Sequence, residues 1–483
     1  MPATSQNLQF APTKPAWAKA IAQPAQEFPL TQLPILSGSI PTALRGTLYR
    51  NGPARLERGG EKVGHWFDGD GAILAIHITD EGATGTYRYV KTAGLIAEEA
   101  ENKFLYAGYG MTPPGLIWKR WGKSAKNTAN TSVMALPDKL LALWEGGNPH
   151  ALDRHSLQTF GRDDLEGALD GDRAFSAHPK RDPITGEFYN FGLTPGLNAT
   201  LNLYRGDATG KIFQTSTIQL DGLPLVHDFV MAGRYLVFCV PPVQINLLPV
   251  AIGIQSFSDS MQWEPDRGTE ILVVDRETLG VVSRETVDPW YQWHFANGFV
   301  DRDGSILVDV VRYADFKTNQ YLKEVATGET HTPAKATLWR LRIDPQSGHI
   351  KVQDEVINRS CEFPEIKPHQ LGQATDSLYL SVHSAGADIA KDVLGAIAHV
   401  DLATGELTEA DPGENRYPSE PIYASHPDNP DQGWILTVVF DGTTESSEVW
   451  IYDADGLDRS PICRLGLPSI IPLSFHGTWA PQR

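Results

Sequence analysis

Residues 201–213, Leu-Asn-Leu-Tyr-Arg-Gly-Asp-Ala-Thr-Gly-Lys-Ile-Phe, decide the fold class. Leu201 and Leu203 alternate with other side chains, a polar turn follows at 206–210, and a second short run begins after it. Alternation with a period of two predicts a half-buried strand, and an Asp- and Gly-containing turn between two such runs predicts a β-hairpin. The stretch therefore predicts an all-β fold.

The same pattern recurs at 149–161, 271–283, 338–352, 396–407 and 449–457. Its instances begin about 50 to 70 residues apart, which is typical of four-stranded β-propeller blades with loop insertions of variable length. A pair of β-sandwiches would have similar turns, so it stays open as the alternative fold.

Composition narrows the class of protein. The net charge of −18 over 483 residues argues against general nucleic-acid binding. The three cysteines, Cys239, Cys361 and Cys463, form no CxxC pair, which predicts free thiols in a reducing compartment. No apolar run approaches the roughly 18 to 20 residues of a membrane span, and residues 1–16 have no secretory pattern. We expect a cytoplasmic protein that lies at most on a membrane surface.

Two apolar insertions interrupt the β pattern. Residues 112–126 predict a basic amphipathic helix, and residues 240–257 predict an apolar loop containing prolines. Such runs are commonly buried core, but both also fit insertions on one face of the repeat array. Their apolar members are Leu116, Ile117, Trp118, Trp121, Leu247, Leu248, Val250 and Ile252, and the basic members of the first are Lys119, Arg120 and Lys123.

Four histidines are the candidate metal ligands. They are His178 in Ser-Ala-His-Pro, His227 in Val-His-Asp-Phe, His294 in Trp-His-Phe-Ala-Asn-Gly-Phe and His476 in Phe-His-Gly-Thr-Trp. Any one of them alone fits a turn or a strand face equally well. As a quartet without a nearby cysteine they suit iron, copper or nickel better than a structural zinc ion.

Three glutamates in apolar contexts are candidates for orienting these rings. A metal-bound imidazole usually donates its other N–H to a carboxylate or a carbonyl. The candidates are Glu145 in Leu-Trp-Glu-Gly-Gly, Glu362 in Ser-Cys-Glu-Phe-Pro and Glu420 in Pro-Ser-Glu-Pro-Ile. Each could instead accept hydrogen bonds from backbone amides in a turn.

Together with three N-terminal motifs, these contexts resemble the carotenoid cleavage oxygenase family. The motifs are Gly-Thr-Leu-Tyr-Arg-Asn-Gly-Pro at 46–53, His-Trp-Phe-Asp-Gly-Asp-Gly at 65–71 and Asn-Thr-Ala-Asn-Thr at 127–131. The resemblance is strongest to the cyanobacterial apocarotenoid oxygenase subgroup, through Leu-Ala-Leu-Trp-Glu-Gly-Gly at 141–147 and Phe-His-Gly-Thr-Trp at 475–479. It covers one domain, residues 28–483, after an N-terminal extension, residues 1–27.

The resemblance implies a seven-bladed β-propeller with its insertions forming a cap over an axial metal site. One Fe(II) per chain would be bound by His178, His227, His294 and His476, with Glu145, Glu362 and Glu420 orienting three of the four rings. Only six hairpins are visible, so we expect N- and C-terminal strands to close the remaining blade.

The implied reaction is cleavage of a conjugated double bond by O2 into two carbonyl products, within an apolar tunnel of a monomeric enzyme. Aromatic faces would stabilise positive charge on the polyene, although each ring could equally be core. The candidates are Phe67, Trp144, Trp293, Phe295, Phe363 and Phe475. The apolar members of the two insertions would contact one leaflet of a membrane, with the basic residues meeting headgroups.

Three rival functions stay open. Stilbene-cleaving relatives carry a lysine just before the glutamate of the Trp-Glu-Gly motif, where this chain has Trp144, which favours an apolar polyene. The second rival is a retinoid isomerase, for which this chain has no specific motif. A non-catalytic propeller scaffold would have no need of the histidine quartet.

Overall fold

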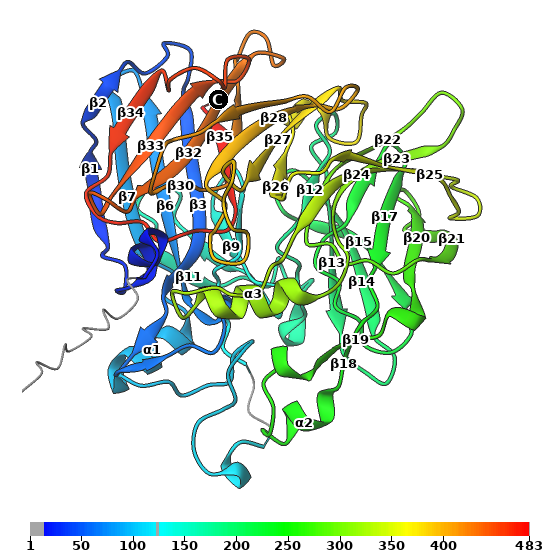
Figure 1. The fold of residues 1–483 in the computed structure, drawn as a ribbon. Coiled ribbons are helices and arrows are strands. Elements are labelled where there is room, and N and C mark those ends of the chain that lie inside the picture. The colour runs from blue at the N-terminus through cyan, green and yellow to red at the C-terminus, as the bar shows by residue number, and fades with distance from the viewer. Residues whose placement is uncertain (1–13, 122–124, 483) are drawn as a thin grey trace, which may run out of the picture.

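The computed structural model describes residues 14–121 and 125–482, and it has an all-β, propeller-like architecture (Figure 1). Six sheets of four or more strands account for most of the described chain. Two of them are β11-β10-β9-β8 (Thr159–Arg162, His150–Leu152, Leu140–Leu143, Ser132–Ala135) and β12-β13-β14-β15 (Lys180–Arg181, Phe188–Thr194, Thr200–Gly206, Ile212–Gln219). Another is β26-β27-β28-β29 (Cys361–Glu365, Ser377–Val382, Ala396–Asp401, Leu407–Ala410).

The largest sheet has eight strands and consists of two antiparallel halves. Its order is β21 (Gly280–Val287), β20 (Thr269–Asp275), β17 (Tyr235–Val240), β16 (Val230–Ala232), then β22 (Phe295–Val300), β23 (Ile306–Tyr313), β24 (Ala336–Ile343) and β25 (Ile350–Ile357). A single parallel pair, Ala232↔Gly298, joins the halves.

The two remaining large sheets contain the ends of the described chain. One has the order β1 (Phe28–Gln32), β7 (Gly82–Tyr89), β6 (Asp70–Thr79), β3 (Gly46–Arg55), β35 (Gly477–Pro481). The other has β2 (Ile35–Gly38), β34 (Cys463–Gly466), β33 (Ser446–Asp453), β32 (Gly433–Asp441) and β30 (Arg416–Pro418), with β31 (Ile422–Ser425) also pairing with β32. Pairing of Gly46 with Pro481 through Arg50 with Gly477 brings strands from opposite ends of the described chain into one sheet, as expected.

The middle strands of the sheets are buried on both faces, whereas outer strands such as β15 and β25 are partly exposed. Leu74, Ile76 and Ile78 of β6 enter one apolar cluster, whereas Ile73 and Ala75 enter another. Successive side chains of a strand point to opposite faces, so this sheet packs against a neighbour on each side. This arrangement directs the innermost strands toward a common centre.

Five of the six expected hairpins are present as adjacent antiparallel strands. They are β10–β11, β14–β15, β20–β21, β24–β25 and β28–β29. In the sixth, β33 pairs with β34, but the return strand begins only at Cys463, because a loop follows the expected turn. The sequence pattern did not predict the hairpin formed by β6 and β7.

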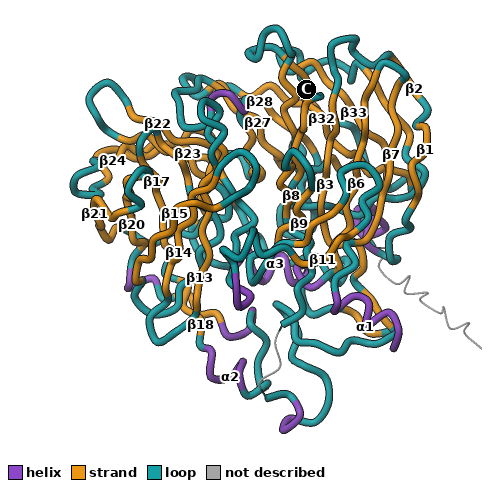
Figure 2. Tube along the Cα trace, turned by 180° about the vertical axis from the view of Figure 1, so that it is seen from behind, coloured by secondary structure: helices purple, strands orange, loops and turns teal. Residues whose placement is uncertain are grey.

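The helices lie outside the sheets, where Figure 2 shows them mainly along one side of the molecule. The α-helices among them are α1 (Ala93–Glu101), α2 (Leu247–Ala251) and α3 (Lys317–Val325). Two short β-ribbons, β18 (Val243–Ile245) with β19 (Met261–Trp263) and β4 (Glu57–Arg58) with β5 (Glu61–Lys62), complete the pairings. No helix within residues 14–121 and 125–482 is long and apolar enough to cross a bilayer.

The prediction of a helix over residues 112–126 is wrong for the part of that stretch that the structure describes. Only a three-residue 3₁₀ helix, Ile117–Lys119, forms there. Pro113 and Pro114 lack the N–H that a helix needs and Gly115 lies at φ +95°, so a helix cannot extend through them. Lys123 lies outside the described residues.

Candidate metal centre

The four candidate histidines come from different sheets and meet at one point. His178, His227, His294 and His476 precede β12, β16, β22 and β35 respectively. Each of these strands lies at an edge of its sheet or half-sheet, away from the outer hairpin. The fold therefore places these four histidines, which are far apart in sequence, next to the first residues of four inner strands.

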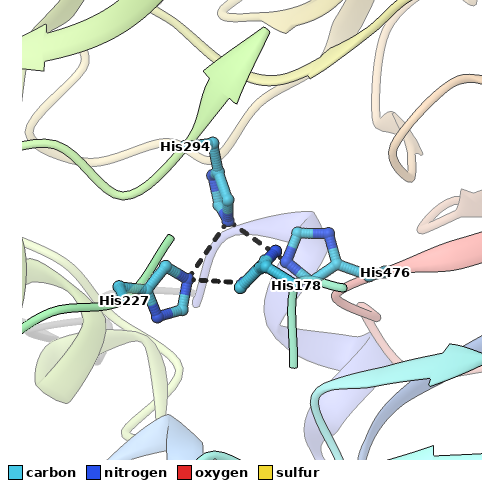
Figure 3. A group of neighbouring side chains, drawn as sticks. All are labelled: His178, His227, His294 and His476. Atoms are coloured by element: carbon cyan, nitrogen blue, oxygen red, sulfur yellow. Dashed lines mark hydrogen bonds between the residues drawn. The ribbon is translucent and has the colours of Figure 1, made fainter. Parts of the chain in front are cut away.

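The convergence is through one nitrogen of each ring. Nε2 of His178 lies 2.9 Å from Nε2 of His227, which lies 3.3 Å from Nε2 of His294. Nε2 of His294 lies 3.1 Å from that of His476 (Figure 3). One ligand nitrogen from each of the four buried residues lies within 4.8 Å of the others.

Glutamates face the opposite nitrogen of three rings. Nδ1 of His227 lies 2.5 Å from Oε1 of Glu145, and Nδ1 of His294 lies 2.5 Å from Oε2 of Glu362. Nδ1 of His476 lies 2.8 Å from Oε1 of Glu420. His178 has no carboxylate within ion-pair distance among the described residues. Burial and the three neighbouring rings lower the pKa of His178 well below its ordinary value.

This donor set fits a metal ion. A carboxylate only accepts hydrogen bonds, so the ring protons of His294 and His476 sit on Nδ1 and their lone pairs on Nε2. Glu145, close to Nδ1 of His227, favours the same tautomer there. The unprotonated Nε2 atoms then face one another at about 3 Å, an arrangement of like dipoles that a central cation would stabilise. Four imidazoles without a thiolate suit a first-row transition metal.

Two residues that sequence reasoning missed hold the glutamates in place. Tyr313 donates its hydroxyl proton to Oε1 of Glu362 at 2.9 Å. Arg50 pairs with Oε2 of Glu420 at 3.0 Å, and the backbone N–H of Gly477 donates to the same oxygen. Arg50 stands in the motif at 46–53, but nothing in a one-dimensional pattern links it to a glutamate 370 residues away.

A cavity of about 480 Å³ lies beside the quartet. Five of the six aromatic residues expected around a tunnel line it, namely Phe67, Trp144, Trp293, Phe363 and Phe475. Phe295 does not line it and packs instead with Val230 and Val237 in the core. Because strand side chains alternate, the residue after the inward-facing His294 points away from the centre.

The two apolar insertions lie together at one end of the molecule (Figure 1). Nη1 of Arg120 donates to the carbonyl of Gly253 at 3.1 Å, which ties one insertion to the other. Leu116, Ile117, Trp118, Trp121 and Leu248 are exposed, whereas Leu247, Val250 and Ile252 are half-buried. Leu247 and Val250 also line the cavity. Ile254 of the second insertion and Leu197, which lies outside both insertions, are also exposed, at 56% and 97%.

Comparisons with known proteins agree along nearly the whole chain. The family described as retinal pigment epithelial membrane protein (RPE65) matches residues 21–481. Apocarotenoid-15,15'-oxygenase of Synechocystis is 33% identical over 458 residues, covering 92% of each chain. Resveratrol cleavage oxygenase 1 of Aspergillus fumigatus is 26% identical, covering 98% of this chain and 96% of its own. The structure of cobalt-substituted Synechocystis ACO superposes with a TM-score of 0.87 at 31% identity, covering 97% of this chain and 98% of that one.

Proposed function

The chain belongs to the carotenoid cleavage oxygenase family, that of the retinal pigment epithelial membrane protein, and on this premise we propose that it cleaves a conjugated double bond of an apocarotenoid or carotenoid. O2 would be the co-substrate and two carbonyl compounds, one of them retinal-like, the products. The observation that carries the proposal is the histidine quartet, with its three glutamates, beside a cavity lined by aromatic side chains.

We propose that His178, His227, His294 and His476 hold one Fe(II). When bound, this redox-active ion would supply activation of O2. The chain's own contribution is to present four neutral donors, because Glu145, Glu362 and Glu420 keep the Nδ1 proton of three rings in place.

The cavity residues would bind the polyene and exclude water. Phe67 and Trp293 pack edge-to-face at 5.6 Å between centroids, and Phe67 packs against Phe475 at 5.3 Å. Aromatic faces stabilise neighbouring positive charge, so these rings would stabilise charge that develops along a conjugated chain. Trp144 lines the same cavity and favours an apolar substrate over a phenol at that position.

The finer architecture is also part of the proposal. We count the two halves of the eight-stranded sheet as separate blades, because one residue pair alone joins them, and this gives seven blades. Residues 28–483 would form one domain. The preceding segment packs onto it through Trp17, which is fully buried. The insertions at 112–126 and 240–257 would cap the metal site.

The exposed apolar residues of the insertions would let a monomeric, cytoplasmic enzyme rest on one leaflet of a membrane and extract its substrate. Trp118 and Trp121 suit the headgroup level, where amphipathic rings are favoured. Leu247 and Val250 reach from this surface to the cavity lining, so they would lead an apolar substrate inward.

The deciding experiment measures metal content and products together. Purified protein should contain about one iron per chain and should convert a long apocarotenal into two carbonyl products, detected by chromatography. The panel should include intact carotenoids and resveratrol. Replacing any one of the four histidines with alanine should abolish turnover. Full activity of such a variant, or cleavage of resveratrol alone, would contradict the proposed substrate class or site.

A further inference from the structure

Two neighbouring polar atoms at the end of one strand in the lining of the cavity have no hydrogen-bond partner among the described residues. They are Oγ of Ser381 and Nδ1 of His383. The side chains are 1% and 5% exposed, so bulk water does not satisfy them. Buried polar groups without partners cost free energy and are uncommon in folded proteins. An occupant of the cavity that bonds both atoms would remove that cost.

Several other polar groups of the lining already have partners. The Tyr313 hydroxyl donates to Glu362, Oγ1 of Thr318 accepts from Nε1 of Trp293, and Oγ of Ser419 accepts from the N–H of Val438. Nε1 of Trp66 is a further unpaired donor on a different element. Ser381 and His383 stand apart because Ser381 lies in β27 and His383 directly follows that strand.

Strand geometry places the two atoms on one face. Ser381 pairs with Glu362 in the ladder of β26 and β27, and the N–H of His383 donates to the carbonyl of Ser360 at 3.2 Å, which continues it. Residues two apart on a strand share a face and are separated by about 6.6 Å. A single oxygen atom that bonds both side chains spans about 5.6 Å, so it can fit between them.

The protonation of His383 fixes which chemical group matches. Nε2 of His383 lies 3.4 Å from the carbonyl oxygen of Asp392, which can only accept, so the ring proton sits on Nε2. Burial lowers the pKa of His383 to about 4, so the ring is neutral near pH 7. Nδ1 is therefore an acceptor and needs a donor. A hydroxyl can donate to Nδ1 and accept from Ser381, whereas a carbonyl or ether oxygen cannot donate.

We propose that Ser381 and His383 form a subsite for a hydroxyl group carried by the conjugated substrate. The inference rests on the proposed function and names a feature of its substrate. The hydroxyl can come from the ring of a hydroxylated apocarotenoid or from a phenol, and the two sources share this chemistry.

The test compares matched substrate pairs, namely 3-hydroxylated and unsubstituted apocarotenals, and resveratrol and unsubstituted stilbene. The variants are His383→Leu and Ser381→Ala, with His383→Asn and Ser381→Thr retaining an acceptor and a hydroxyl. Ser419→Ala, in the same lining but already bonded to the backbone, is the matched control. Each loss variant should lower the kcat/KM preference for the hydroxylated member about 3- to 10-fold, the value of one neutral hydrogen bond. The unsubstituted member should be cleaved as before, and the retaining variants and the control should keep the preference.

An unchanged preference in both loss variants overturns the subsite, as does an equal fall for both members of a pair. Equilibrium binding by quenching of tryptophan fluorescence gives the same comparison without turnover. If wild-type protein cleaves none of the substrates, the proposed function fails, and the binding comparison still decides the subsite. Whichever pair shows the preference identifies the source of the hydroxyl.

Discussion

The guanidinium of Arg50 lies 3.0 Å from the carboxylate of Glu420, and both side chains are buried. The other carboxylate oxygen of Glu420 accepts from Nδ1 of His476. Arg50 also donates to the carbonyl of Phe475, the residue before His476. Arg50 thus supports one histidine through its carboxylate and through its backbone.

Arg50→Met should destabilise the protein strongly, because it leaves the buried carboxylate of Glu420 without its cation. Breaking a buried pair by removing one partner typically costs about 3 to 5 kcal/mol. Arg45→Met is the control, since Arg45 pairs with Asp80, which is almost fully exposed, and such pairs contribute about 0 to 1 kcal/mol. Urea denaturation of both variants measures the difference. Equal free energies of unfolding would show that the buried pair has no special role.

Replacing Glu145 or Glu362 with glutamine should weaken metal binding about 10- to 100-fold, because the orienting carboxylate of a ring is lost. Chelator competition with the reloaded protein measures the affinity. Glu365→Gln is the control. Burial and the nearby Glu420 raise the pKa of Glu365 to about 8, so a neutral amide replaces a carboxyl that is already largely neutral at pH 7. Equal loss of affinity in all three variants would mean that the effect is not specific to the rings.

The sequence predicted most of the outer hairpins and the convergence of the four histidines, since both have recognisable local contexts. The Asp- and Gly-rich turn at 206–210 sets its own hairpin. The prediction that Phe295 lines the cavity was wrong, because its motif does not indicate which face of the strand points inward. Arg50, Tyr313, Ser381 and His383 were missed because their roles depend on which strands become neighbours. Ser381 acquires its place only by pairing with Glu362 in the ladder.

Stability should fall in mild acid because of buried neutral histidines. Burial lowers the pKa of His383 to about 4 and that of His65 to about 3. Between these values and the unfolded value of about 6.5, the unfolded chain binds protons that the folded chain does not, so the free energy of unfolding decreases as pH falls. One such group contributes at most about 1.4 kcal/mol per pH unit.

His383→Asn should therefore flatten the dependence of the unfolding free energy on pH between about pH 6.5 and pH 4. His331→Asn is the matched control, because the side chain of His331 is exposed. Urea denaturation at several pH values measures both slopes. A slope that is the same in His383→Asn and in the wild type would show that this ring is not held neutral by burial.

Membrane binding should depend on the two insertions and not on exposed apolar residues elsewhere. Trp118, Trp121 and Leu248 are each more than 60% exposed, at 63%, 62% and 70%. Burying such side chains in a bilayer is worth about 1.5 to 3 kcal/mol each, so a triple serine variant should lose co-sedimentation with liposomes.

A second triple variant changes Ile184, Phe213 and Val281, which are also exposed but lie outside the insertions near the ends of other strands. That variant should sediment like the wild type. Both triple variants should retain cleavage of a detergent-solubilised apocarotenal, since neither changes the quartet. Equal loss of liposome binding in the two would assign it to general hydrophobicity, and unchanged binding in the first would remove the insertions as the contact surface.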